Sequence, residues 1–206
     1  MLDNQFGRSM VETLGVLAII GVLSVGGMAG FSKMISQNKV NKTLEQIGII
    51  SSKLSAVGSN AISYSGLSNK SAIKYNAVPA EAIVSTSGTL QNPFGGNIAI
   101  APSSLVADAA DMQAYTITYS GLSEYACVTL GSSDWSNSKN ASLLGLGVGK
   151  SGQAATIINK IYQGCSSSAT SSYAVGCPGG IPMEADTVAN ACDCSGNTCE
   201  LVVKFF

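Results

Sequence analysis

The feature that most constrains this chain is a long apolar stretch close to its start, inside FGRSMVETLGVLAIIGVLSVGGMAG at residues 6–30. Residues 14–31 carry no charged side chain. A helix needs about 20 mostly apolar residues to cross the hydrocarbon of a bilayer. The sequence therefore predicts a single membrane-spanning helix over residues 10–31. A cleaved secretory signal is the rival interpretation, but the helical pattern continues without a break beyond Gly30.

The residues that follow continue the helix with one apolar face. Apolar side chains recur at helical spacings of three, four and seven, at Val40, Leu44, Ile47, Leu54 and Val57. Charged and polar side chains are expected on the other faces, namely Lys39, Lys42, Glu45, Gln46 and Lys53. Together the two stretches predict one helix of about 50 residues, about 75 Å long. Its first half is apolar all round, and its second half is predicted to pack against a folded domain.

After Gly58 the chain becomes rich in Ser, Asn and Gly, and it predicts one globular head over residues 59–206. Residues 58–90 are interpreted as an irregular connection with little core of its own, containing a short helix over 79–84. Alternation predicts strands over 97–101 and 114–119, a helix opening with Ser123 as its N-cap, and a last strand after Cys199. The segment GQAATIINKIYQGC fits a short helix or a strand. The predicted fold class is α+β, a long N-terminal helix packed on a small antiparallel sheet.

Composition excludes several classes of function. The chain has no histidine, its net charge is -1, and 11% of its residues are charged. Histidine-based catalysis and a basic surface for nucleic acid are therefore not expected. The segment GLGVGKSG ends like a phosphate-binding loop, but the position that requires its first glycine is Leu144. The sequence predicts no enzyme, no catalytic residue, no cofactor and no metal.

Six cysteines all lie in the second half of the chain, at Cys127, Cys165, Cys177, Cys192, Cys194 and Cys199. An even number in a loop-rich region favours up to three disulfides in an oxidising compartment, although six cysteines allow fifteen pairings. A thiolate zinc site at Cys192, Cys194 and Cys199 is the alternative. Its spacing is not the usual paired C-x-x-C, and no histidine can complete it.

The first residues resemble the N-terminal signature of type IV pilins and pseudopilins. The resemblance rests on Gly7 followed by RSMVE, on Glu12 as the fifth residue after that glycine, and on TLGVLAIIGVLSVGG. It implies that a prepilin peptidase cuts between Gly7 and Arg8, removes residues 1–7 as a leader and methylates the new amine. Here Arg8 stands where the family usually has Phe, Met or Leu. Glu12, a costly charge in lipid, would neutralise the terminal amine of a neighbouring subunit.

The head resembles the type IVb subgroup of pilins more weakly, through NPFGG and YTITYSGLSEYACVTL. In that subgroup a helix cysteine is bridged to one near the end of the chain. The resemblance implies a bridge from Cys127 to Cys192, Cys194 or Cys199. The expected pairing is Cys127–Cys192, Cys165–Cys177 and Cys194–Cys199. The bridge from Cys127 closes the C-terminal region of the head.

The resemblance implies a structural subunit of a type IV pilus. Residues 8–31 would form the transmembrane and filament-core half of the helix, 32–58 its amphipathic half, and 59–206 the head. The subunit would span the bacterial inner membrane once with its head in the periplasm, and then join an extracellular pilus. Expected partners are other subunits, the prepilin peptidase and the pilus assembly machinery. The alternatives are a pseudopilin or minor pilin of a type II secretion or DNA-uptake system, and a membrane-anchored periplasmic binding domain.

Overall fold

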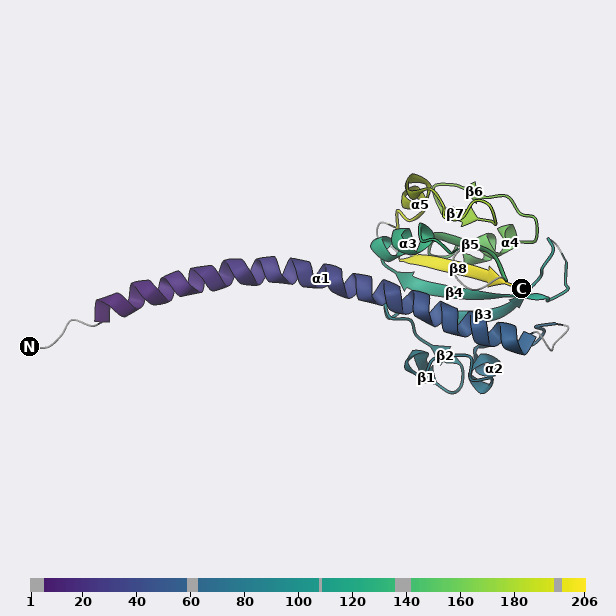
Figure 1. The fold of residues 1–206 in the computed structure, drawn as a ribbon, viewed down its shortest axis with the longest axis horizontal. Coiled ribbons are helices and arrows are strands. Elements are labelled where there is room, and N and C mark those ends of the chain that lie inside the picture. Colours follow the sequence, from purple (N-terminus) through teal and green to yellow (C-terminus); the bar gives the residue numbers. More distant parts are fainter. Residues whose placement is uncertain (1–5, 59–62, 108, 136–141, 195–197) are drawn as a thin grey trace, which may run out of the picture. The chain divides into compact units, whose positions relative to one another are not determined.

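The structure is a computed structural model that describes residues 6–58, 63–107, 109–135, 142–194 and 198–206. The chain divides into two compact units, residues 1–38 and 39–206. Helix α1 (Phe6–Gly58) is the only described element of the first unit and continues into the second (Figure 1). The predicted helix of about 50 residues is therefore present as 53 residues. In the part of the chain that the structure covers, no helix is both long enough and apolar enough to cross a membrane.

Within the second unit, α1 contributes one broad buried face. Val40, Ile47, Ile50 and Leu54 are all at most 3% exposed. Gln46, which was expected on a polar face, is also buried at 3% exposure, so that prediction is wrong. The reason is geometric. Gln46 lies three residues after buried Thr43 and four before Ile50, and those spacings place all three side chains on one side of the helix.

The head is built on a six-stranded antiparallel sheet with strand order β3-β4-β8-β5-β7-β6. The strands are β3 (Ile98–Ser103), β4 (Ala114–Leu122), β5 (Leu143–Lys150), β6 (Ser168–Ala169), β7 (Tyr173–Gly176) and β8 (Cys199–Phe205). In the middle of the sheet Val203 pairs with Ile117 on one side and Leu146 on the other. The α+β fold class is thereby confirmed.

Helices cover both faces of this sheet. One hydrophobic core lies on the first face. It contains Tyr115, Ile117 and Tyr119 of β4, together with side chains of α3 (Glu124–Gly131), of α5 (Ala185–Ala191) and of the part of α1 in the second unit. The Tyr115 hydroxyl lies 3.1 Å from the Ser51 carbonyl of α1 and donates to it. Helix α4 (Ala154–Lys160) packs on the other face in a second cluster with Val175 and Val202.

Residues 63–97 form more structure than the sequence predicts. The expected irregular connection contains α2 (Asn69–Lys74), started by a capping box between Ser68 and Ser71. The helix expected over 79–84 is a single 3-10 turn, η1 (Ala80–Ala82), leading into a small sheet of β1 (Ile83–Ser85) and β2 (Thr89–Leu90). Capping boxes are usually read as S-x-x-E, so the Ser-x-x-Ser pair was easy to miss.

Asn69, the first residue of α2, also completes the outer edge of β3. Its Nδ2 donates to the Ile98 carbonyl at 2.9 Å, and its Oδ1 accepts from the Ile100 N–H at 2.7 Å. The side-chain amide thus takes the place of a peptide group from a neighbouring strand.

Three strands and one helix of the head were correctly predicted from the sequence. β3, β4, α3 and β8 lie where alternation and capping placed them. Ser123 caps α3 by accepting from the Ala126 N–H at 3.3 Å. The ambiguous segment GQAATIINKIYQGC contains helix α4 rather than a strand.

Candidate functional site

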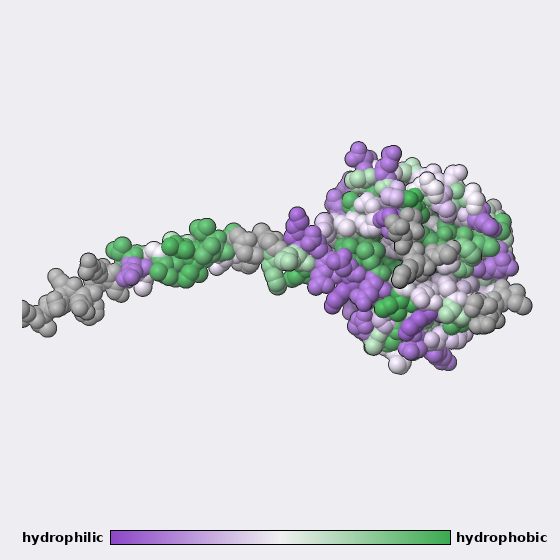
Figure 2. Space-filling model, in the orientation of Figure 1, coloured by the Kyte–Doolittle hydropathy of each residue, from purple (hydrophilic) through white to green (hydrophobic). Residues whose placement is uncertain are grey.

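The first candidate site is the apolar segment of α1 in the first unit. Its large apolar side chains between residues 10 and 25 are each 52–75% exposed (Figure 2, green). They are Met10, Val11, Leu14, Val16, Leu17, Ile19, Ile20, Val22, Leu23 and Val25. Glu12 is the one charged residue among residues 10–25, and it too is exposed. Scattered exposed apolar residues are ordinary, but a contiguous run of this size marks an interaction surface.

The two residues expected at the processing site lie at the start of the same helix. Gly7 and Arg8 fall within α1, whereas residues 1–5 of the expected leader are outside the described part of the chain. Arg8 and Glu12 are four residues apart, which places both positions on one face of α1.

The second candidate site is the disulfide-closed region of the head. The structure contains the bridges Cys127–Cys192, Cys165–Cys177 and Cys194–Cys199. This is the expected pairing, and the resemblance to type IVb pilins implied one part of it, a bridge from Cys127 to one of the last three cysteines. Cys127 lies on α3 and Cys192 ends α5, so their bridge ties together two helices 65 residues apart in the chain. With every cysteine in a disulfide, Cys192, Cys194 and Cys199 offer no thiolate to the alternative zinc site.

Two of the bridges lie against each other. The Sγ atoms of Cys127, Cys194 and Cys199 are all within 4.8 Å of one another, and Cys192 is bonded to Cys127. All four residues are at most 5% exposed. This proximity could not be predicted from the sequence, because it depends on how α3, α5 and β8 meet in the fold.

On the other face of the sheet, two charged residues of β8 hold the two ends of α4. Backbone N–H groups of Gly152, Gln153 and Ala154 hydrogen-bond to the Glu200 carboxylate. Four residues along the strand, the Lys204 ammonium donates to the Ile161 and Ile158 carbonyls at 2.5 and 3.5 Å. The negative charge is thus at the positive end of the helix dipole, and the positive charge is at its negative end.

Burial shifts the protonation of both residues. Glu200 is 5% exposed, and desolvation raises the pKa of its carboxyl, against the opposing effect of the N–H hydrogen bonds. Lys204 is 3% exposed, and desolvation lowers the pKa of its ammonium, partly offset by the charge of Asp111. The Oε1 atom of Glu200 has no hydrogen-bond partner among the described residues. The capping roles of Glu200 and Lys204 were not predicted from the sequence, where both residues were expected only to lie on the last strand.

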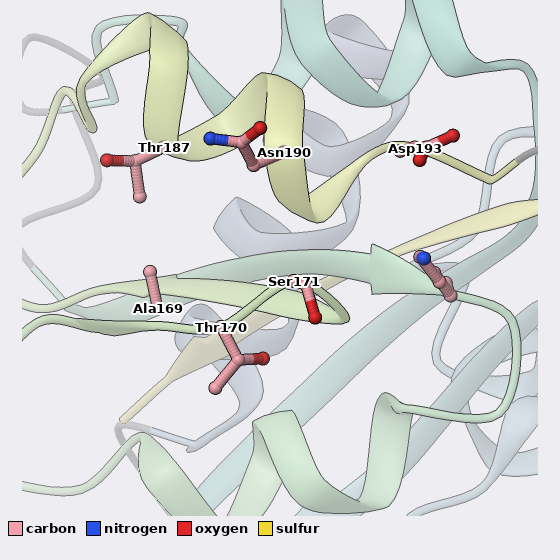
Figure 3. A pocket seen from close by; sticks show the side chains of 7 residues that line it. Ala169, Thr170, Ser171, Thr187, Asn190 and Asp193 are labelled. Carbon is pink, nitrogen blue, oxygen red and sulfur yellow. The ribbon is translucent and has the colours of Figure 1, made fainter.

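A polar groove of about 410 Å³, within the size range of ligand pockets, lies between α5 and the turn from β6 to β7. Thr187 and Asn190 approach it from α5, and Thr170 and Ser171 lie opposite (Figure 3). Lys150, Ala169 and Asp193 complete its lining. These side chains offer hydroxyl, amide and charged groups for hydrogen bonding. None of them was predicted from the sequence as a site residue.

The segment GLGVGKSG does not form a phosphate-binding loop. Residues 143–150 are β5, and its backbone pairs with β8 and β7. A phosphate-binding loop needs its backbone N–H groups free to surround the phosphate, whereas here Gly147 is paired on both sides.

The fold is that of a type IV pilin: it resembles the crystal structure of TcpA, a type IV pilin from Vibrio cholerae El Tor biotype, with a TM-score of 0.51, 17% identity, and coverage of 83% of this chain and 99% of that one. The family model described as PilS N terminal matches residues 36–198, and the chain belongs to this family.

Curated relatives give a partial match. The chain is 27% identical over 124 residues to the major structural subunit of bundle-forming pilus from Escherichia coli O127:H6 (strain E2348/69 / EPEC), and equally to that from Escherichia coli O111:H-. The match covers 60% of this chain and spans 62% of the length of these relatives.

Proposed function

We propose that the chain is a structural subunit of a type IV pilus of the b subgroup, a building block rather than an enzyme. The observation that carries this proposal is the exposed apolar segment of α1, with Glu12 as its only charge between residues 10 and 25. Family membership, the type IV pilin fold and the likeness to bundle-forming pilus subunits support it. Side chains of this kind gain about 1.5–3 kcal/mol each on full burial, so packing such helices together in a filament would be strongly favourable.

In this proposal, prepilin peptidase cuts between Gly7 and Arg8 and frees an amine at Arg8. A carboxylate buried without a partner is costly, and it becomes tolerable when an opposite charge lies beside it. Glu12 would therefore pair with the freed and methylated amine of a neighbouring subunit. This pairing would also set the axial position of one subunit against the next, because a displaced subunit would leave the carboxylate unpaired.

We also propose a membrane stage before assembly, in which residues 10–31 anchor the subunit in the inner membrane and residues 59–206 lie in the periplasm. The three disulfides support an oxidising location for the head. Pilus assembly machinery in the same membrane would then move subunits into the extracellular filament. Alkaline extraction of membranes tests this stage: unassembled subunit should stay with the membrane pellet, and recovery in the soluble fraction would contradict it.

The principal test uses sheared filaments and the variant Glu12→Ala. Mass spectrometry of filament protein should give a subunit that starts at Arg8, and Glu12→Ala should abolish or greatly reduce filaments seen by electron microscopy. The matched control is Glu45→Ala, which removes an exposed acid from the same helix in the second unit and should leave filaments unchanged. Normal piliation in Glu12→Ala would remove this residue from the assembly site.

The polar groove beside α5 favours a second candidate, a membrane-anchored periplasmic binding domain. That function requires neither cleavage at Gly7 nor polymerisation, so intact residues 1–7 on a chain found only as single copies would support it. A pseudopilin or minor pilin would be cleaved in the same way but present in few copies. The amount of this chain relative to other filament proteins distinguishes that role from a major subunit.

A further inference from the structure

The paired disulfides at the end of α5 suggest a chemical role that is separate from filament assembly. The Sγ atoms of Cys127, Cys194 and Cys199 lie within 4.8 Å of one another, and Cys192 is bonded to Cys127. We propose that these four cysteines form an intramolecular thiol–disulfide relay during folding. In this relay the Cys194–Cys199 bridge forms first and passes its oxidising equivalent to Cys127 and Cys192.

Loop length favours this order. Cys194 and Cys199 are 5 residues apart, whereas Cys127 and Cys192 are 65 apart. The probability that the two ends of a flexible chain meet falls as about the 3/2 power of length, which favours the short loop by about fifty-fold. An oxidant encountering the reduced chain would therefore close Cys194–Cys199 before it closes the long loop.

Accessibility favours the same order. Cys194 is 5% exposed whereas Cys127, Cys192 and Cys199 are each 0% exposed, so Cys194 is the residue of this cluster that an external oxidant reaches. Cys127 and Cys192 have no exposed area once α3 and α5 have packed. An external oxidant cannot reach that pair in a nearly folded head, but the neighbouring bridge can.

Each S–S bond that forms in the exchange replaces an S–S bond that breaks. A disulfide oxidant first takes two electrons from the Cys194 and Cys199 thiols and becomes two thiols. The Cys127 thiolate then attacks Sγ of Cys194 or Cys199, breaks that bridge and releases the other sulfur as a thiolate. The Cys192 thiolate attacks Sγ of Cys127 and displaces the remaining partner. The products are the Cys127–Cys192 disulfide and a Cys194/Cys199 dithiol, which a second molecule of oxidant closes again.

The third bridge provides a matched control. Cys165 and Cys177 belong to the hydrophobic cluster on the α4 face of the sheet, not to the one that holds the four relay cysteines. Substituting both of these cysteines removes one disulfide from the head and leaves all four relay cysteines in place. The relay does not depend on whether the folded chain forms filaments.

The first experiment refolds the reduced full chain with oxidised glutathione, quenches it with an alkylating agent and maps disulfides by peptide mass spectrometry. With a single equivalent of oxidant, Cys194–Cys199 should appear first and then decline as Cys127–Cys192 rises. In C194A/C199A, closure of Cys127–Cys192 should slow by about tenfold or more, toward the rate set by the long loop alone. In C165A/C177A the rate should stay within about twofold of wild type. Equal slowing in the two variants would overturn the relay.

The second experiment does not depend on folding speed. The variant C192A/C194A keeps Cys127 and Cys199 as the only two cysteines of the cluster. If exchange passes through their mixed disulfide, these two should pair on oxidation and give one defined cross-linked peptide. The companion variant C192A/C199A tests the mixed disulfide of Cys127 with Cys194 in the same way. Cys127 that is alkylated as a free thiol in both variants, after full oxidation of Cys165–Cys177, would overturn the proposal.

Discussion

Three alternate glycines on β5, Gly145, Gly147 and Gly149, lie where neighbouring segments approach this strand closely. Their positions face the side of the sheet that α4 covers, next to the paired strand β7: a methyl group at Gly147 would come 2.4 Å from Ile157 and 3.0 Å from the Ala174 carbonyl. Leu146 and Val148, in between, point into the main core. The glycines therefore let a helix approach the strand closely, at the expense of local strand propensity.

Gly147→Ala should destabilise the head by about 1–3 kcal/mol, because the added methyl group has no space against Ile157 and backbone. Urea unfolding of the full chain measures this change. The control is Gly48→Ala in α1, where nothing lies within 4 Å of the added methyl. That substitution should stabilise by up to about 1 kcal/mol through helix propensity. Equal effects from the two substitutions would refute the packing role of Gly147.

At the scale of elements, α4 is held at both ends by one strand. A helix of 7 residues is too short to be stable in isolation, and it leaves backbone N–H and carbonyl groups unpaired at its ends. Glu200 and Lys204 satisfy these groups from the adjacent strand. Two buried charges thus serve as caps, and their charges are compensated by the helix ends rather than by each other.

The Glu200 cap predicts a pH-dependent stability. Burial raises the pKa of its carboxyl above 4.5, so the folded state binds this proton more tightly than the unfolded chain does. Its contribution to the free energy of unfolding is then largest below pH 4.5 and falls as pH rises through the folded pKa. Urea titrations from about pH 4 to pH 7 should show wild type losing stability relative to Glu200→Gln.

Asp111 provides a control of opposite sign. The Leu105 N–H donates to its Oδ1 at 2.9 Å, and this hydrogen bond lowers the pKa of the carboxyl below 3.8. Wild type should therefore lose stability relative to Asp111→Asn as pH falls through that range. If both comparisons slope in the same direction, the assignment of the Glu200 shift to burial is wrong.

The parts of the fold that follow from short-range pattern were predictable, and the parts that depend on distant contacts were not. Alternation marked β3 and β4, and Ser123 marked the start of α3. Strand β5 carries Gly where another element packs, and helix α5 is only 7 residues long, so the local preference of each is weak. The burial of Gln46 and the sulfur cluster at Cys127 likewise come from tertiary packing. The apolar segment of α1 was predictable because its signal is contiguous, and the assembly role of Glu12 stays a prediction.

At the scale of the whole molecule, the three disulfides differ in how much of the unfolded chain they restrict. The loop-entropy relation assigns about 4 kcal/mol to the 65-residue separation, about 3 kcal/mol to the 12-residue one and about 2 kcal/mol to the 5-residue one. The bridge from α3 to α5 should therefore matter most for the stability of the head.

Paired alanine substitutions test this order. C127A/C192A should lower the free energy of unfolding most, with C165A/C177A and C194A/C199A following in that sequence. Guanidinium unfolding of each full-length variant at one pH provides the comparison. A larger loss in C194A/C199A than in C127A/C192A would show that local packing, rather than loop closure, determines the effect.

The amide of Asn69 that closes β3 has a consequence for how copies of this chain meet at high density. Exposed strand edges invite further strands from other molecules and lead to amyloid-like growth. Here one edge of the main sheet is occupied by a side chain, and the opposite edge, β6, offers only 2 residues. In the proposed filament, crowded heads would therefore touch without merging into one continuous sheet, and helix contacts would decide the order of the polymer.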